Sequence, residues 1–101
     1  MKVQIDENKS FKVWWQRELN KKKDGSIRKS KNGQNRINTI CYIANRDGKD
    51  IIYYEKAIQN KDDNFSKAMG RKISLTKAVR SFTKPERTIF WENYLKNCKI
   101  R

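Results

Sequence analysis

Acidic side chains are the groups in this chain best suited to catalytic chemistry, because the chain contains no histidine. Without histidine the commonest general base is missing, together with the Ser-His and Cys-His pairs of nucleophilic catalysis. A metal-dependent nuclease would instead need carboxylates that converge from separate elements, with a lysine nearby. The candidates for such a site are Asp47, Asp50, Glu55 with Lys56, Asp62 and Asp63.

These carboxylates have a simpler explanation. Asp47 and Asp50 lie in a stretch typical of a tight turn, and Asp62 and Asp63 lie where a helix is expected to begin. There is no Gly-rich phosphate-binding loop, because Gly70 is solitary. We therefore predict that the protein is not an enzyme and has no catalytic residue, with a small nuclease as the less favoured alternative.

Two cysteines, Cys41 and Cys98, lie far apart in the sequence. Two cysteines without histidine supply neither the number nor the spacing of ligands that a zinc site requires. We expect reduced, buried thiols, no metal site and no cofactor.

Positive charge is the strongest compositional signal. The chain has 25 Lys+Arg against 11 Asp+Glu, a formal net charge of +14. Such an excess predicts attraction to polyanions, so nucleic acid, or a protein that handles it, is the expected partner. A basic protein without such a role is the alternative. The chain has no apolar run of about 18 residues and its first residues are too polar for a secretion signal, which predicts a cytoplasmic protein without a membrane segment.

The cations are densest between residues 20 and 36. This segment has seven Lys and Arg, one acidic residue, and Ile27 as its single apolar side chain, so we expect a flexible basic loop or an extended hairpin. Its cations are suited to neutralise phosphates; a merely solubilising loop is the alternative. They are Lys21, Lys22, Lys23, Arg28, Lys29, Lys31 and Arg36.

The stretch 11–19 alternates as a strand does. Phe11, Val13 and other odd-numbered residues share the face expected to be core, and Lys12 and Trp14 lie on the other face. A tryptophan among polar residues beside a lysine is a candidate stacking or interface anchor. The alternative is that a loop or a neighbouring strand partly covers Trp14.

Further strands are expected around residues 3–5, at 37–44 and at 51–58. The last two are rich in β-branched and aromatic residues, and the Asp47-Gly48 pair between them is typical of a hairpin turn. Both are apolar on both faces, which predicts central positions in a sheet.

A helix is expected from Asp62 to Phe82, with acidic and amide residues at its start as N-caps. Its apolar positions are Phe65, Ala68, Met69, Leu75, Ala78, Val79 and Phe82. Gly70 interrupts this pattern, so we expect either a kink or that Arg71 and Lys72 raise their charges to the rim of the core. Those two cations are further candidates for partner binding.

A second helix is expected to follow, up to about residue 97. Thr83 and Glu86 form a capping box, and Pro85 fits the first turn. Its apolar stripe is expected to be core, and consists of Phe90, Trp91, Tyr94, Leu95 and Cys98. The whole chain, 1–101, is thus expected to be a single α+β domain, with an antiparallel sheet of about four strands covered by two C-terminal helices.

A sequence resemblance covers about Thr39 to Leu95. The main run is Asp63-x-Phe65-x-Lys67-x-x-Gly70-Arg71-Lys72-x-x-Leu75-x-x-Ala78, supported by Cys41-x-Ile43, Asp47-Gly48, Ala57 and Arg87-x-x-Phe90-Trp91-x-x-Tyr94. With these residues the chain resembles small phage and mobile-element proteins of Gram-positive bacteria. Proteins of that kind are often host-takeover or anti-defence factors, including anti-CRISPR proteins. The resemblance implies a phage-type origin but neither a mechanism nor a catalytic residue.

Two functions remain from this reasoning. The first, which the resemblance favours, is a non-catalytic inhibitor that binds a host nucleoprotein such as a CRISPR effector in the cytoplasm of the host bacterium. The second is direct binding of DNA or RNA, in which the 20–36 segment, Lys12, Arg71 and Lys72 contact phosphates and Trp14 stacks on a base.

Overall fold

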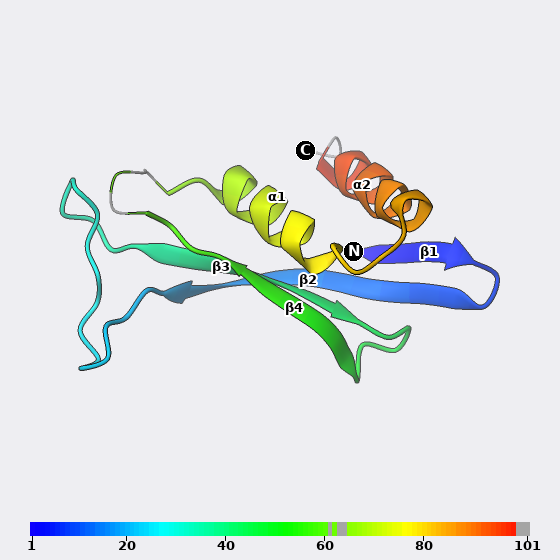
Figure 1. Cartoon of the computed structure of the whole chain (residues 1–101), viewed down its shortest axis with the longest axis horizontal. Helices are drawn as coiled ribbons and strands as arrows, with labels where there is room; N and C mark the ends of the chain where they lie inside the picture. The colour runs from blue at the N-terminus through cyan, green and yellow to red at the C-terminus, as the bar shows by residue number, and fades with distance from the viewer. Residues whose placement is uncertain (61, 63–64, 99–101) are drawn as a thin grey trace.

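The computed structural model describes residues 1–60, 62 and 65–98, and in this part of the chain it forms four strands followed by two helices. The elements are β1 (Lys2–Asp6), β2 (Lys9–Leu19), β3 (Ile37–Ala44), β4 (Ile51–Ala57), α1 (Lys67–Ala78) and α2 (Lys84–Cys98). The strands form one antiparallel sheet in chain order, and both helices lie on the same side of it (Figure 1). The predicted α+β architecture is confirmed.

The strands differ in length, and this leaves part of β2 at the edge of the sheet. The pairing of β1 with β2 ends at Lys2 opposite Lys12, next to backbone hydrogen bonds that join Met1 and Val13. From Trp14 onward β2 pairs with β3 only.

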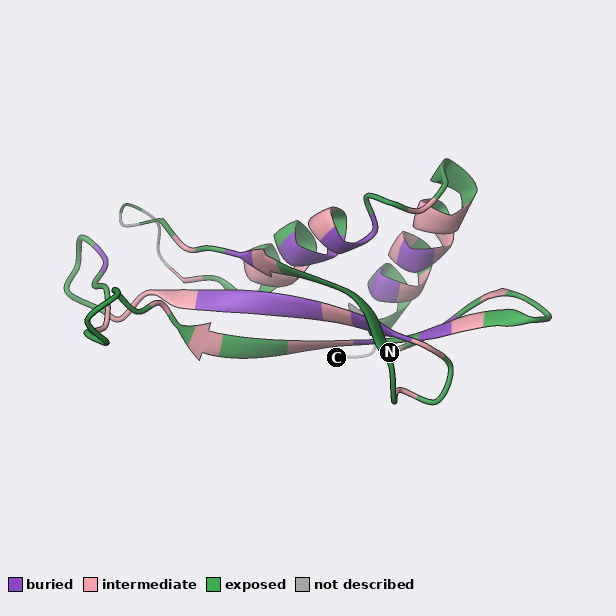
Figure 2. Cartoon of the chain, turned by 60° about the horizontal axis from the view of Figure 1, so that its bottom comes forward, coloured by how far each residue is buried: buried purple, intermediate pink, exposed green. Residues whose placement is uncertain are grey.

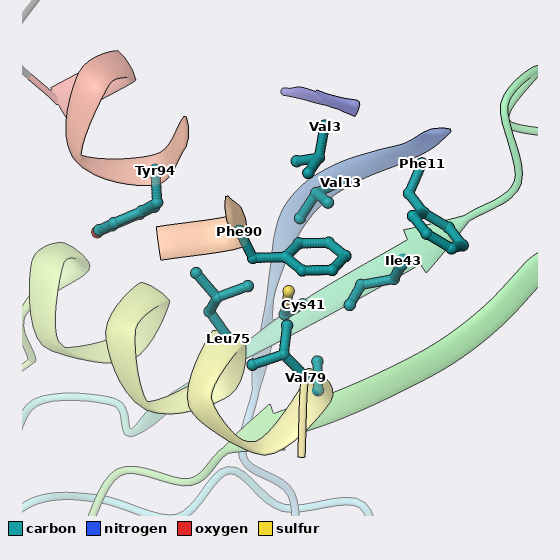
Figure 3. Close-up of a cluster of buried hydrophobic side chains, with 10 residues drawn as sticks. Val3, Phe11, Val13, Cys41, Ile43, Leu75, Val79, Phe90 and Tyr94 are labelled. Atoms are coloured by element: carbon teal, nitrogen blue, oxygen red, sulfur yellow. The ribbon is translucent and has the colours of Figure 1, made fainter. Parts of the chain in front are cut away.

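The core lies between the sheet and the helices. Phe11 and Val13 of β2 are buried there, as the alternation predicted, and Phe90 of α2 packs among them (Figure 3). The ring of Phe82 is 4.8 Å from that of Phe90 and 5.3 Å from that of Phe11, so a cluster of aromatic rings fills this small core. Leu19, also predicted to be core, is 40% exposed, because it lies beyond the reach of the helices at the end of β2.

Helix α1 is shorter than predicted and turned differently. Its N-cap is Ser66, whose hydroxyl accepts a hydrogen bond from the Met69 N–H, and not the acidic stretch at 62–64; Asp63 and Asn64 lie outside the described residues. Met69 was predicted to be core but is 54% exposed. Instead, the side of the helix that carries Gly70 and Ser74 packs against the sheet.

Gly70 explains this orientation. A Cβ at position 70 would lie only 2.9 Å from the Cβ of Thr39, so the missing side chain lets the helix backbone approach β3 closely. Ser74 is buried on the same side, and its hydroxyl is satisfied there because it donates to the carbonyl of Gly70, at 2.7 Å. Lys72 consequently points to solvent and lies outside the buried side of the helix.

Helix α2 begins as predicted. The Thr83 N–H donates to Glu86 Oε1 at 3.0 Å, and the Glu86 N–H donates to Thr83 Oγ1 at 3.4 Å, which confirms the capping box. Phe90 and Tyr94 are buried, but Leu95 is 51% exposed and that part of the predicted stripe is wrong. Helix α2 lies beside β1 and also packs on β2, where the ring of Phe90 is 5.8 Å from that of Phe11 and the ring of Tyr94 is 5.6 Å from that of Trp15. The side chain of Cys98 lies outside the described residues.

The prediction that both apolar strands are central is half right. Strand β3 is central and mostly buried, whereas β4 is an edge strand (Figure 2). Its residues Ile51, Ile52 and Tyr54 are all about half exposed or more. An edge strand with exposed aliphatic and aromatic side chains is unusual in a monomeric protein, so this surface calls for a functional explanation.

Candidate nucleic-acid interface

In the part of the chain that the structure describes, no helix lies on the side of the sheet opposite α1 and α2 (Figure 1). We call this side the open face. It carries the side chains that alternate with the core positions, and their cross-strand partners follow from the register of the strands. On β2, β3 and β4 they are Lys12, Trp14, Gln16, Glu18, Asn38, Ile40, Tyr42, Tyr54 and Lys56.

Three aromatic side chains form a row across the open face. Trp14 pairs with Tyr42, and Tyr42 pairs with Tyr54, so the three rings lie on neighbouring strands. The centroids of Trp14 and Tyr42 are 5.4 Å apart with ring planes 19° from parallel, and those of Tyr42 and Tyr54 are 6.3 Å apart at 29°. Cross-strand pairs of this kind stabilise a sheet by about 0.2–1 kcal/mol each. Trp14 and Tyr42 are half-buried, and Tyr54 is 62% exposed.

A shallow hollow lies beside this row. Ile40, Ile51 and Ile52 line it together with the rings of Tyr42 and Tyr54 and the stem of Lys56. Ile40 is only 5% exposed, so it forms the floor. The hollow thus has an aliphatic floor and an aromatic wall, and its size and flatness suit a planar apolar group rather than a metal ion.

The ammonium of Lys56 is held by an ion pair on the open face. Its Nζ lies 3.0 Å from Glu18 Oε2, and Asn38 Nδ2 donates to the same oxygen at 3.2 Å. The hydrogen bond from Lys56, helped by the one from Asn38, lowers the pKa of Glu18 although partial burial opposes the shift. Because the Glu18 carboxylate is paired with Lys56, it repels an approaching anion less than an unpaired carboxylate would.

The basic segment, residues 20–36, connects β2 to β3, and hydrogen bonds between its backbone groups hold it in two turns. Asn20 N–H donates to the Arg36 carbonyl, Arg28 N–H to the Asn20 carbonyl, and Arg36 N–H to the Arg28 carbonyl, all at 2.8–2.9 Å. These bonds form a closed ring of three residues spaced eight apart. Each intervening loop turns at a glycine with positive φ, Gly25 at 89° and Gly33 at 80°. The segment is therefore a two-turn extension of the β2–β3 hairpin.

The cations of the basic segment point outward. Five lysines and Arg28 are exposed, and Arg36 is half-buried near the sheet. The one acidic residue, Asp24, accepts hydrogen bonds from the hydroxyl and the N–H of Ser26, at 2.6 and 2.9 Å, and these lower its pKa. Asp24 therefore serves the turn and does not neutralise the neighbouring lysines by an ion pair.

The basic segment stands at one end of the open face. The first of its two turns extends to the side of the sheet that the helices leave free, and the second extends toward the helix side (Figure 1). At the other end of the face Lys12 lies across the strand pair from Lys2, and its side chain lies over Gly48 in the β3–β4 turn. Positive charge thus lies on both sides of the aromatic row, toward the two ends of the strands.

The predicted binding residues divide between the two sides of the sheet. Lys12 and Trp14 lie on the open face, on the same side of the sheet as each other, whereas Arg71 and Lys72 lie on α1, on the opposite side. The Arg71 guanidinium lies 5.8 Å from the centroid of the Trp15 ring, a cation–π contact that gives this residue a structural role. One flat ligand would not contact both groups at once.

Sequence reasoning missed Tyr42, Tyr54 and Lys2 as members of the open face. Each is separated from Trp14 in the sequence by a turn or by the basic segment, and only the strand register shows that they share a face of the sheet with Trp14. Trp14 and Tyr42 are equidistant from the midpoint of the hairpin that contains residues 20–36, and this symmetry is the signal that could have identified Tyr42 as the partner of Trp14.

Two of the carboxylates considered for catalysis, Asp47 and Asp50, have structural partners in the β3–β4 turn. Asp47 Oδ1 accepts from the Lys49 N–H at 2.9 Å, and Asp50 Oδ2 accepts from the Asn45 amide at 3.0 Å. Within the described residues, no three Asp, Glu or Cys side chains gather as metal ligands would. The described helices are also too short or too polar to cross a membrane.

Comparison with known proteins finds no relative of this chain. No family model matches the chain, and neither a curated protein nor a solved structure shows significant similarity to it. The protein is therefore classified by its architecture alone. The described residues form a four-stranded antiparallel sheet with two helices on one side, an open aromatic face and a basic extension of the central hairpin.

Proposed function

We propose that this protein binds nucleic acid through the open face and the basic segment, without catalysis. The observation that carries the proposal is the one-sided fold: the helices leave one face of the sheet free, and the exposed cations of the basic segment stand at its end. A sheet face of this kind accommodates an extended polyanion, and Lys and Arg side chains at its end supply the phosphate contacts that dominate affinity.

Salt dependence tests the role of the basic segment. Each phosphate contact to a single strand contributes about −0.7 to the slope of log K against log salt concentration. We expect wild-type protein to bind a fluorescently labelled oligonucleotide in an anisotropy titration, with affinity that falls steeply as salt rises. Replacing five lysines by glutamine should then weaken binding at low salt and reduce the magnitude of the slope by up to about 3.5. The five are Lys21, Lys22, Lys23, Lys29 and Lys31.

A matched control removes the same charge from the other side of the molecule. Five exposed cations on or beside the helices are replaced by glutamine, so that both variants have the same net charge. They are Lys67, Lys72, Arg80, Lys84 and Lys96. The control should keep most of the affinity and of the slope. Equal losses in the two variants would mean that net charge alone attracts the oligonucleotide, and the proposed interface would be wrong.

The inhibitor predicted from the resemblance is a second candidate, and one observation favours it. Ile51 and Ile52 are 49% and 47% exposed beside Tyr54, and aliphatic side chains of this kind are typical of a protein interface. A surface with both cations and aliphatic groups suits a nucleoprotein such as a CRISPR effector. A pull-down from host lysate with wild-type protein and with an Ile52→Lys variant tests this: one partner captured by the wild type alone supports the inhibitor, provided that free oligonucleotide binds weakly.

A further inference from the structure

Phosphate binding alone does not account for the row of Trp14, Tyr42 and Tyr54. Phosphates are bound by cations and N–H groups, whereas exposed aromatic rings bind the faces of bases. We propose that the row is a base-stacking surface, so that the protein binds single-stranded nucleic acid in preference to duplex. This inference rests on the proposed function and specifies its substrate class.

Both ends of the row have an available ring face. Tyr54 lies on β4, an edge strand, and Trp14 lies on the part of β2 that β1 does not cover. In the described part of the chain the ring contacts of Trp14 and of Tyr54 are with Tyr42 alone. The outer side of each terminal ring therefore meets no other aromatic ring, and a base that stacks there continues the row.

The surroundings of Tyr54 fit a base better than they fit a duplex. The hollow beside the ring has Ile40 as its floor, and Ile52 and Lys56 line it. This combination offers an apolar surface to the face of a base and a polar group to its edge. In a duplex the faces of the bases are covered by their neighbours, so only unpaired nucleotides can use the row.

The positions of the charged side chains also favour a single-stranded nucleic acid as the ligand of the open face. Along the direction of the strands, the row has Lys2 and Lys12 on one side and the basic segment on the other, and Glu18, which lies between the row and the basic segment, is paired with Lys56. Cations therefore lie on both sides of the row, where they attract the phosphates of a strand whose bases stack on it. An acidic protein without bases would use these cations but not the free ring faces.

The alternative is that the rings only stabilise the sheet. Variants that keep or remove the ring separate the two roles. Tyr54→Val and Trp14→Val remove the ring but retain side chains that suit a strand, and Tyr54→Phe and Trp14→Phe keep an aromatic ring. Urea denaturation of each variant identifies any loss of binding that follows from unfolding, so that only folded protein is compared.

The test is an anisotropy titration with labelled oligo(dT), oligo(U) and a duplex, each about 20 nucleotides long, a length that exceeds the site of a single small domain. We expect one or both single strands to bind more tightly than the duplex. Tyr54→Val and Trp14→Val should each weaken single-strand binding about tenfold and leave duplex binding unchanged, while the phenylalanine variants bind nearly as the wild type does.

Equal affinity for single strands and duplex, or ring-free variants that bind single strands as tightly as wild type, would overturn the inference. In that case the proposed function still stands if the five-lysine variant loses binding and its charge-matched control does not. If no oligonucleotide binds at low salt, the inference and the proposed function are both wrong.

Discussion

Gly70 of α1 lies against Thr39 of β3 so closely that a Cβ on the glycine would come within 2.9 Å of the threonine Cβ. At an ordinary position inside a helix, replacing glycine by alanine stabilises the helix by about 1 kcal/mol. At this position the added methyl group must push the helix away from the sheet. The sign of the effect therefore reports how closely the two elements are packed.

We accordingly predict that Gly70→Ala lowers the free energy of unfolding by about 1–3 kcal/mol, as overpacking does elsewhere. Urea denaturation followed by circular dichroism measures it. Lys72→Ala, at an exposed position of the same helix, should change stability by less than about 0.5 kcal/mol. A Gly70→Ala protein as stable as the wild type would show that the contact with Thr39 relaxes without cost.

The ion pair of Glu18 and Lys56 makes stability depend on pH. The pKa of Glu18 is lowered in the folded protein, so its contribution is present above the pKa of the unfolded chain and is lost as pH falls through the folded pKa. We predict that Glu18→Gln lowers the urea midpoint at neutral pH and that this difference from wild type disappears in acid. In a Lys56→Gln background the difference at neutral pH should shrink, and an unchanged difference would contradict the pairing.

Burial protects the thiol of Cys41. It is fully buried in the core, and burial raises its pKa to about 12, so almost no thiolate exists near neutral pH. In a Cys98→Ser protein, where Cys41 is the remaining cysteine, Ellman's reagent should react only after denaturant is added. Rapid reaction of the native protein would contradict the buried position of Cys41 in the core.

The parts of the fold that the sequence predicted are those with local signals. Alternation along 11–19 placed Phe11 and Val13 in the core, and the Thr83–Glu86 capping box located the start of α2. The orientation of α1 was not predictable in the same way. A helical wheel counts apolar side chains, whereas this helix is oriented by Gly70, a residue without one.

The candidate site was predictable only in part, for a similar reason. The charge of the basic segment and the polar surroundings of Trp14 are visible in the sequence. The aromatic row depends on cross-strand register, and Tyr42 and Tyr54 belong to strands that are apolar on both faces, so alternation could not identify which face is open. The edge position of β4 follows from topology, which no local pattern specifies.

The most direct test of the account uses the three tryptophans as reporters in one experiment. Trp14 lies on the open face, while Trp15 and Trp91 pack on the helix side. In a ¹H–¹⁵N spectrum each indole N–H gives its own signal, and Trp14→Phe assigns one of them. On titration with oligo(dT) or oligo(U), we predict that the Trp14 signal shifts while the signals of Trp15 and Trp91 stay in place. Shifts confined to Trp15 and Trp91, or no shift of Trp14 at saturation, would contradict binding at the open face.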